Sequence, residues 1–358
     1  MIFWRGLSKE RRLSGRATDP KRKGDRDDIK RILEAAAVAE AEGDADKMRK
    51  ASYKLFRLDL YERAWELRIR SAGFKQQSPI SEWEGNDLAG RSILIRASTR
   101  NRIGEELRLT RFIAPVVQHA RRCIVLAERR LVPLLYRSFA GADIRPQGID
   151  DAAAFADADV AAYYETVARC YAKTAEEMRH SFVPLRADPT LVGSIRQRYN
   201  LISNGPLIGI SWGSKNEKKV LPDLNSWAPL LRWTSANFVL LQYGDIARDL
   251  EMLQRLADDR VIYDREIDQL VDLDGFAAQI AALDAVVSIS NTTIDMAGML
   301  GIPTLHIRGD RGSEIWPQFG QSPWYPSMMF FYKQQRPWPE VFAEARARLE
   351  QMMSTTSL

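Results

Sequence analysis

Two hydrophobic periodicities divide the chain, and one replaces the other near residue 91. Between residues 29 and 75, apolar side chains recur at helical spacing, with an interruption at Gly43-Asp44. This pattern predicts two antiparallel helices joined by a short turn. From residue 91 onward, short apolar runs alternate with longer amphipathic stretches. That alternation is typical of βαβ units with parallel strands.

The short apolar runs predict strands in two groups. An amphipathic helix over residues 105–119 lies between the first two strands, and residues 150–185 have a helical pattern. We therefore expect an α/β protein with two doubly wound, Rossmann-like domains facing a cleft, joined near residues 186–205. The predicted strands are residues 92–96, 123–127, 207–212, 238–242, 260–263, 285–289, 304–307 and 328–332.

A helix over residues 339–353 is predicted to close the chain, and in two facing domains such a helix could cross back to the first domain. The full division then has five parts. They are a basic flexible arm (1–28), a helical extension (29–85), a first α/β domain (86–188), a second α/β domain (189–338) and the closing helical segment (339–358).

The charge of the chain is concentrated at its start. Residues 1–28 hold nine Lys or Arg and five acids, a net charge of +4 out of +5 for the whole chain. The remainder is nearly neutral, which argues against nucleic acid as a partner. The first residues are apolar and then basic, without the features of a signal peptide. They predict a disordered tail or a weak peripheral contact with an anionic membrane surface.

Composition bounds the class of protein. The 358 residues are 45% hydrophobic and 28% charged, as in ordinary globular proteins, and the length suits two domains. No apolar run approaches the ~18 residues of a membrane-spanning helix. Two cysteines and three histidines argue against a disulfide framework or a Cys/His metal cluster, so we predict no metal and no cofactor. The cytoplasm is the expected compartment.

Candidate chemistry lies at two strand ends of the second domain. Asn291, Thr292 and Thr293 follow the strand at 285–289 and begin a helix, so they could seat a diphosphate or simply cap the helix. After the strand at 207–212, Gly213 opens a turn rich in lysine, and Lys215, Lys218 or Lys219 could neutralise a phosphate. The alternative for that turn is a solvated basic loop.

Two further segments are weaker candidates. Arg308 follows the strand at 304–307 and could clamp a phosphate, or belong to an ordinary charged loop. In the first domain, Glu105 and Glu106 open the helix after the strand at 92–96. An acid at this place could act as a general base, although the helix dipole alone favours acids in a first turn.

Seven short segments also occur in a fixed order that is more specific than any one of them. They are LYERAWELRIR at 60–70, WEGNDLAG at 83–90, RIGEEL at 102–107, GISWG at 209–213 with SISNTT at 288–293 and AGMLGIP at 297–303, and SPWYP at 322–326.

This ordered set resembles bacterial tetratricopeptide-repeat-type glycosyltransferases of the GT-B fold, relatives of the ADP-heptose transferases of lipopolysaccharide synthesis. The resemblance covers roughly residues 50–350. It implies metal-independent transfer of a sugar, usually with inversion, from a nucleotide-sugar to a hydroxyl on a glycan, lipid-linked or protein acceptor. By position it implies Glu105 as the base. It also implies donor contacts from Trp212, Gly213, Lys215, Gln242, Tyr243, Asn291, Thr292 and Thr293.

The chain departs from this family pattern at three positions. Glu105 replaces the usual aspartate, Arg102 occupies a usual glycine position, and Asp295 stands where relatives commonly have histidine. A carboxylate at 295 would repel a diphosphate if it faced the ligand. The departures favour one alternative, an inactive GT-B scaffold that binds other proteins. A second alternative is an epimerase or hydrolase that acts on the donor alone.

Overall fold

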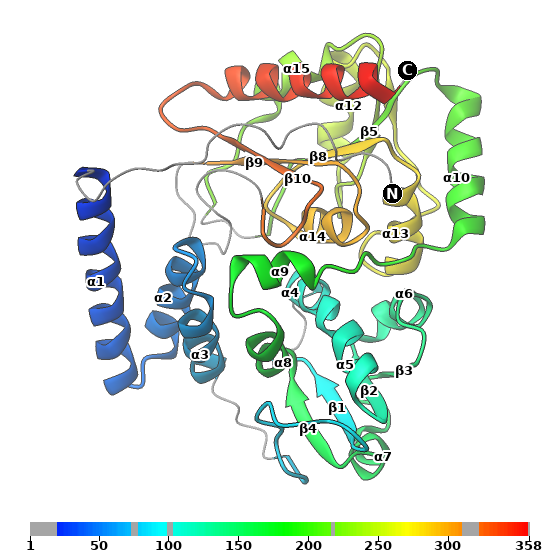
Figure 1. Cartoon of the computed structure of the whole chain (residues 1–358). Helices are drawn as coiled ribbons and strands as arrows, with labels where there is room; N and C mark the ends of the chain where they lie inside the picture. The colour runs from blue at the N-terminus through cyan, green and yellow to red at the C-terminus, as the bar shows by residue number, and fades with distance from the viewer. Residues whose placement is uncertain (1–19, 73–77, 99–102, 216–218, 310–321, 357–358) are drawn as a thin grey trace.

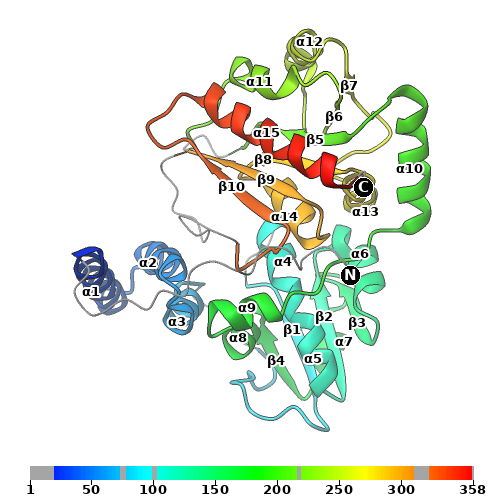
Figure 2. The same cartoon turned by 45° about the horizontal axis from the view of Figure 1, so that its top comes forward.

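The protein consists of two α/β domains and a group of helices beside them (Figure 1). The structure, a computed structural model, describes residues 20–72, 78–98, 103–215, 219–309 and 322–356. Each domain is built on one parallel sheet, and Figure 2 shows the helical extension next to α8 and α9 of the first domain.

The described residues of the helical extension form three helices, where the periodicity predicted two. The break comes at Asp59, whose φ of 59° is left-handed and ends the preceding helix. Asp44 caps the second helix by accepting a hydrogen bond from Lys47 N at 3.0 Å. The first helix begins inside the segment expected to be a flexible arm, and residues 1–19 lie outside the described residues. The helices are α1 (Pro20–Ala41), α2 (Ala45–Arg57) and α3 (Tyr61–Ala72).

The described part of the first domain has four parallel strands in the order β3-β2-β1-β4. The prediction of helix throughout 150–185 was wrong, because β4 lies within it and pairs with β1. Its sequence, VAAY, is short, buried at every position and alanine-rich, so it shows no alternation of polar and apolar residues. The strands are β1 (Ser92–Arg96), β2 (Arg122–Ala127), β3 (Ala142–Pro146) and β4 (Val160–Tyr163).

The helix predicted over 105–119 is divided in the structure. It consists of α4 (Ile103–Leu109), a 3-10 turn (Thr110–Phe112) and α5 (Ile113–His119). Pro115 accounts for the break, because a proline has no N–H and its ring crowds the carbonyl four residues earlier, at Arg111. α4 packs against α14 (Thr292–Met299) of the second domain.

Within its described residues, the second domain has six parallel strands in the order β10-β9-β8-β5-β6-β7. The chain leaves β5 in one direction and later returns to its other side as β8, so the β5/β8 pair is the topological switch point. The strands are β5 (Leu207–Ser211), β6 (Asn237–Leu240), β7 (Val261–Ile262), β8 (Ala285–Ile289), β9 (Thr304–Arg308) and β10 (Met328–Tyr332).

The closing helix α15 (Trp338–Thr356) lies on the second domain and does not cross back to the first. Trp227 and Phe342 fix it there, with ring centroids 4.3 Å apart. None of the helices in the described ranges is long and apolar enough to span a lipid bilayer. The other helices are α6 (Val132–Ser138), α7 (Asp151–Ala156), α8 (Tyr164–Tyr171), α9 (Ala175–His180), α10 (Pro189–Ile202), α11 (Ala228–Leu231), α12 (Ala247–Leu256), α13 (Leu273–Ala281) and α14 (Thr292–Met299).

One continuous apolar core passes through the extension and both domains. At its centre, Trp65 of α3 packs edge-on against Phe112 of the first domain and Trp324 of the second, at 6.3 and 6.0 Å between ring centroids. Trp65 also donates from its indole N–H to Ala172 O at 2.9 Å. The extension is therefore packed into the molecule at the junction of the two domains.

Candidate functional site

Gln242 holds the turn that follows β5. Its Oε1 accepts hydrogen bonds from Trp212 N at 3.0 Å and Gly213 N at 2.6 Å, and also from Ser211 Oγ at 3.1 Å. A Cβ on Gly213 would lie 2.9 Å from Gln242 Nε2, so a larger residue there would displace the Gln242 amide. The Trp212 indole N–H donates to Asp249 at 2.7 Å. Gln242 thus shapes the turn from within.

Asn291 joins the turns after β5 and β8. Its Oδ1 accepts from Thr293 N at 3.1 Å, so the side chain caps α14, as one of the two interpretations required. Its Nδ2 donates to Ser211 Oγ at 2.7 Å and to Gly213 O at 3.2 Å. The two turns therefore share one sheet edge at the switch point, with Thr292 half-buried and Thr293 buried behind them.

Lys215 and Tyr243 form a separate contact at the same edge. The Tyr243 hydroxyl accepts from Lys215 N at 3.1 Å, and the Lys215 ammonium lies 5.7 Å from the centre of the Tyr243 ring. Lys215 is exposed. Lys218 lies outside the described residues.

A small cavity lies nearby, between the loop that follows β5 and the ends of β8 and β9. It has a volume of about 30 Å³ and two cationic residues, Lys219 and Arg308, in its wall. Lys219 donates its ammonium group to Ser290 O. The sequence alone could not show which lysine lines the cavity, since Lys215 and Lys219 belong to the same loop. The described residues that line it include no acid; they are Lys219, Val220, Leu221, Pro222, Ile289, Ser290, Ile307, Arg308, Gly309 and Trp338.

The surroundings of this cavity have a positive potential. Burial lowers the pKa of Arg57 in α2, and the charge of Arg308 lowers it further. His306, fully buried in β9, contacts Ser290 Oγ through Nε2 at 2.7 Å. Burial holds the pKa of His306 well below its usual value, and the charges of Arg308 and Lys219 act in the same direction. His306 is therefore neutral, and the cations favour an anionic ligand.

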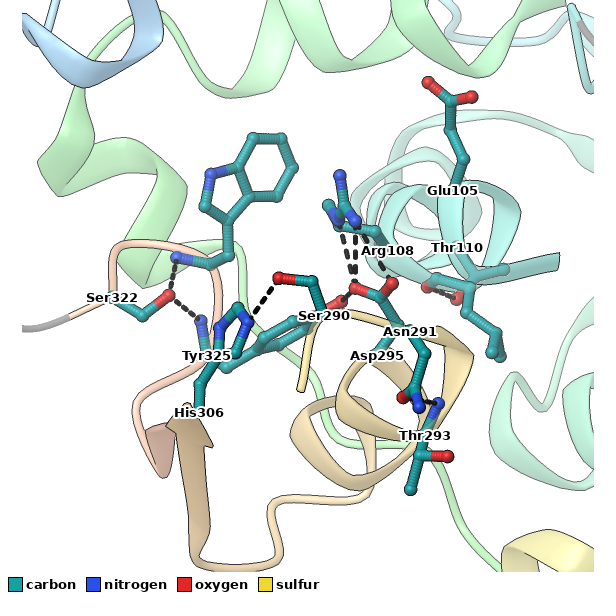
Figure 3. A network of polar contacts seen from close by, with 12 residues as sticks. Glu105, Arg108, Thr110, Ser290, Asn291, Thr293, Asp295, His306, Ser322 and Tyr325 are labelled. Atoms are coloured by element: carbon teal, nitrogen blue, oxygen red, sulfur yellow. Dashed lines mark hydrogen bonds and ion pairs between the residues drawn. The ribbon is translucent and has the colours of Figure 1, made fainter. Parts of the chain in front are cut away.

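The two domains meet where α4 packs against α14 (Figure 3). Asp295 of α14 accepts from Arg108 Nε and Nη2, both at 3.1 Å, and from the Tyr325 hydroxyl at 2.7 Å. Burial alone would lower the pKa of Arg108, but the Asp295 carboxylate raises it. The Asp295 carboxylate thus faces the first domain, where a guanidinium neutralises it, so repulsion of a diphosphate is not its role in this structure.

Arg111 links the same two domains from the 3-10 turn. Its guanidinium is fully buried and donates to Trp324 O and to Met178 O, both at 2.5 Å. Burial lowers the pKa of Arg111 to about 10, so it remains charged near neutral pH. The SPWYP segment therefore supplies a carbonyl and, through Tyr325, a hydroxyl to this junction.

The two adjacent acids of α4 have different surroundings. Glu105 points away from the Arg108–Asp295 pair and forms an ion pair with Arg68 of α3. Glu106 is buried and accepts from Glu128 N at 2.9 Å, while burial raises its pKa to about 7. Arg102 lies outside the described residues. Across those that are described, no group of three or more His, Cys, Asp or Glu is placed to hold a metal ion.

Comparisons with known proteins extend these observations. No protein-family model matches the chain. Protein FlbA of Caulobacter vibrioides is 27% identical over 279 residues, covering 72% of this chain and 46% of FlbA. The chain thus spans about half the length of the curated relative that it matches.

Two solved structures share its architecture. The ADP-heptose lipopolysaccharide heptosyltransferase II of E. coli has a TM-score of 0.51 at 13% identity, over 73% of this chain and 99% of that structure. A family 9 glycosyltransferase from Veillonella parvula has a TM-score of 0.51 at 11% identity, over 71% and 89%. Such likenesses establish the fold: the chain has the two parallel-sheet α/β domains of GT-B proteins, together with a helical N-terminal part.

Proposed function

We propose that this protein transfers a sugar from a nucleotide-sugar to a hydroxyl group of a glycan, lipid-linked or protein acceptor, without a metal ion and with inversion. The observation that carries the proposal is the cationic wall formed by Lys219 and Arg308 at the carboxyl ends of β8 and β9. In open α/β sheets this edge is where ligands bind, and the two cations suit a diphosphate.

In the proposed mechanism, Glu105 takes the proton from the acceptor hydroxyl. The acceptor oxygen forms a bond to the anomeric carbon, and the bond from that carbon to the diphosphate oxygen breaks. The diphosphate leaves with the electron pair, stabilised by Lys219 and Arg308 and by the turn around Asn291. Thr292, Thr293 and Lys215 complete the proposed diphosphate site.

Trp212 and Gly213 are proposed to approach the diphosphate together with Lys215, and the base or ribose is proposed to lie near Gln242 and Tyr243. The cavity of about 30 Å³ holds only a water-sized group. The nucleoside therefore lies mainly outside it, and a single phosphate oxygen is the part of the ligand that fits the cavity.

An inactive binding scaffold is the second candidate, and one observation favours it. Both Glu105 and Asp295 are held in ion pairs, with Arg68 and Arg108 respectively, as in a site that has become structural. The tetratricopeptide character of α1 to α3, a cytoplasmic location and a weak membrane contact of the basic start stay predictions.

A ligand screen tests the proposal against the scaffold. We expect ADP, UDP, GDP or CDP to raise the melting temperature of the full chain in the presence of EDTA, because a ligand that binds the native state stabilises it. At a ligand concentration 100 times Kd, the gain in free energy of unfolding is about 2.7 kcal/mol.

The corresponding nucleotide-sugar should then release its nucleoside diphosphate, at least slowly, with water as the acceptor. A nucleotide that binds without any turnover of its sugar derivative would support the scaffold. A shift that EDTA abolishes would contradict the metal-independent mechanism.

A further inference from the structure

The helical extension reaches the proposed catalytic base. Arg68 of α3 forms an ion pair with Glu105 of α4, although the two helices belong to different parts of the fold. The side chains are 7% and 18% exposed, respectively. At this exposure, water and salt screen the attraction much less than they would on an open surface.

Arg68 is itself held in place by the neighbouring helix. Its Nη1 donates to the Tyr53 hydroxyl at 3.1 Å, and its guanidinium carbon lies 5.5 Å from the centre of the Tyr53 ring. Because Tyr53 belongs to α2, two helices of the extension fix the direction of this guanidinium. The contact with Glu105 is therefore made by a side chain with little freedom of its own.

The backbone that carries Arg68 is equally fixed. Trp65, one turn earlier in α3, bonds to Ala172 O and packs against Phe112 and Trp324. A shift of α3 relative to the two domains would break these Trp65 contacts. The position of the Glu105 carboxylate is thus coupled to the docking of the extension.

We propose that Arg68 is a positioning residue for glycosyl transfer, and that the helical extension is in this way part of the active site. Arg68 holds Oε1 of Glu105, so that Oε2 is directed at the acceptor hydroxyl and takes its proton. The inference rests on the proposed function, because Glu105 acts as a base only if the protein transfers a sugar.

A double-mutant cycle tests this role in the full chain. The variants are Arg68→Ala, Glu105→Gln and the two combined, and the measured rate is release of nucleoside diphosphate from the nucleotide-sugar whose nucleotide gives the largest shift in the ligand screen. We expect Arg68→Ala to lower kcat by about 10²-fold, the scale of loss from a misplaced group, with the KM for the donor unchanged. In the Glu105→Gln background it should have no further effect on kcat, because its target is gone.

Two further variants separate positioning from structural support. Arg70→Ala is the matched control, since Arg70 lies on the same helix and pairs with Glu40 inside the extension. It should leave kcat unchanged. Arg68→Lys keeps a charge and should recover part of the rate.

Three outcomes overturn the inference and leave the proposed function standing. The first is an unchanged kcat for Arg68→Ala. The second is an equal loss of kcat when Arg68→Ala is made in the wild type and in Glu105→Gln. The third is a loss of kcat for Arg70→Ala comparable to that for Arg68→Ala. Absence of nucleotide binding and of donor turnover in the wild-type protein would instead contradict the proposed function, and the inference with it. Urea midpoints of all variants, measured in parallel, show whether a lost rate reflects unfolding.

Discussion

Arg108 and Asp295 connect the two domains through a bidentate ion pair, with Nε–Oδ1 and Nη2–Oδ2 distances of 3.1 Å. The pair is shielded, as the two side chains are 17% and 6% exposed. The hydroxyl of Tyr325 satisfies Asp295 from the second domain as well. A residue that departs from the family pattern thus has a structural partner of its own.

Removal of one member of this pair should destabilise the protein strongly. We expect Asp295→Ala to lower the free energy of unfolding by about 3–5 kcal/mol, because it leaves the Arg108 charge buried without its carboxylate. Arg108→Ala should have a similar effect, and the double variant should cost less than the sum of the two. Urea denaturation of the three variants measures this coupling, and strictly additive losses would contradict it.

Gly104 is predicted to tolerate no side chain. An added Cβ would lie 2.6 Å from Asp295 Oδ2, which cannot withdraw because Arg108 and Tyr325 hold it. Gly104→Ala should therefore cost about 1–3 kcal/mol, the usual range for overpacking. The same change in an Asp295→Ala background should cost less, since the clashing atoms are gone. If Gly104→Ala lowered the free energy of unfolding equally in the wild type and in Asp295→Ala, the cause would be the backbone of α4 and not the contact with Asp295.

Glu106 should make stability depend on pH. Burial raises its pKa from 4.5 to about 7, so between these values the folded protein holds a proton that the unfolded chain has released. Stability consequently falls as the pH rises through this interval, by up to about 3 kcal/mol at 1.36 kcal/mol per pKa unit.

Glu106→Gln tests this dependence, because glutamine is neutral at every pH and can still accept from Glu128 N. The variant should match the wild type near pH 4.5 and be more stable at pH 8, in urea titrations at both values. The exposed Glu176→Gln is the matched control and should leave the pH profile unchanged. If the stability of Glu106→Gln depended on pH in the same way as that of the wild type, the Glu106 carboxyl would not be the cause of the pH dependence.

Lys219 and Lys215 should differ in their effect on nucleotide binding. Lys219 lines the cationic cavity, whereas Lys215 is exposed beside Tyr243. Lys219→Ala should weaken binding of the nucleoside diphosphate by about 1.5–3 kcal/mol, or roughly 10- to 100-fold, the value of a charge-assisted phosphate contact. Lys215→Ala should weaken it less. Calorimetric titration of both variants gives the comparison, and the opposite ranking would move the diphosphate towards Tyr243.

The sheet architecture could be predicted from sequence because buried parallel strands are continuous apolar runs between amphipathic helices. The strands at 285–289 and 328–332 have the predicted limits. Two strands of the first sheet, β3 and β4, were not predicted. β3 is an edge strand of sequence ADIRP in which only Ile144 is buried, so it has no continuous apolar run. In β4, the alanines and the helices on either side conceal the run. The closing helix α15 was predicted. The domain on which it packs could not be predicted, because that choice depends on tertiary contacts and not on the local sequence pattern.

The candidate site was predictable only in part. That Gly213 and Asn291 lie together follows from strand ends sharing one sheet edge. The ion pairs of Asp295 with Arg108 and of Glu105 with Arg68 could not be foreseen, because each joins residues of different parts of the chain whose relative placement is set by tertiary packing.

The core shared by the extension and both domains has a consequence for folding and for evolution. Trp324 packs against Phe56 and Trp65 of the extension, while its carbonyl accepts from Arg111 of the first domain. A molecule joined in this way should unfold in a single cooperative transition, with no stable intermediate that has lost only its first helices. We therefore expect that helices α1 to α3 could not be replaced by the corresponding helices of a related protein without loss of stability. Its inner face and the two domains have to change together.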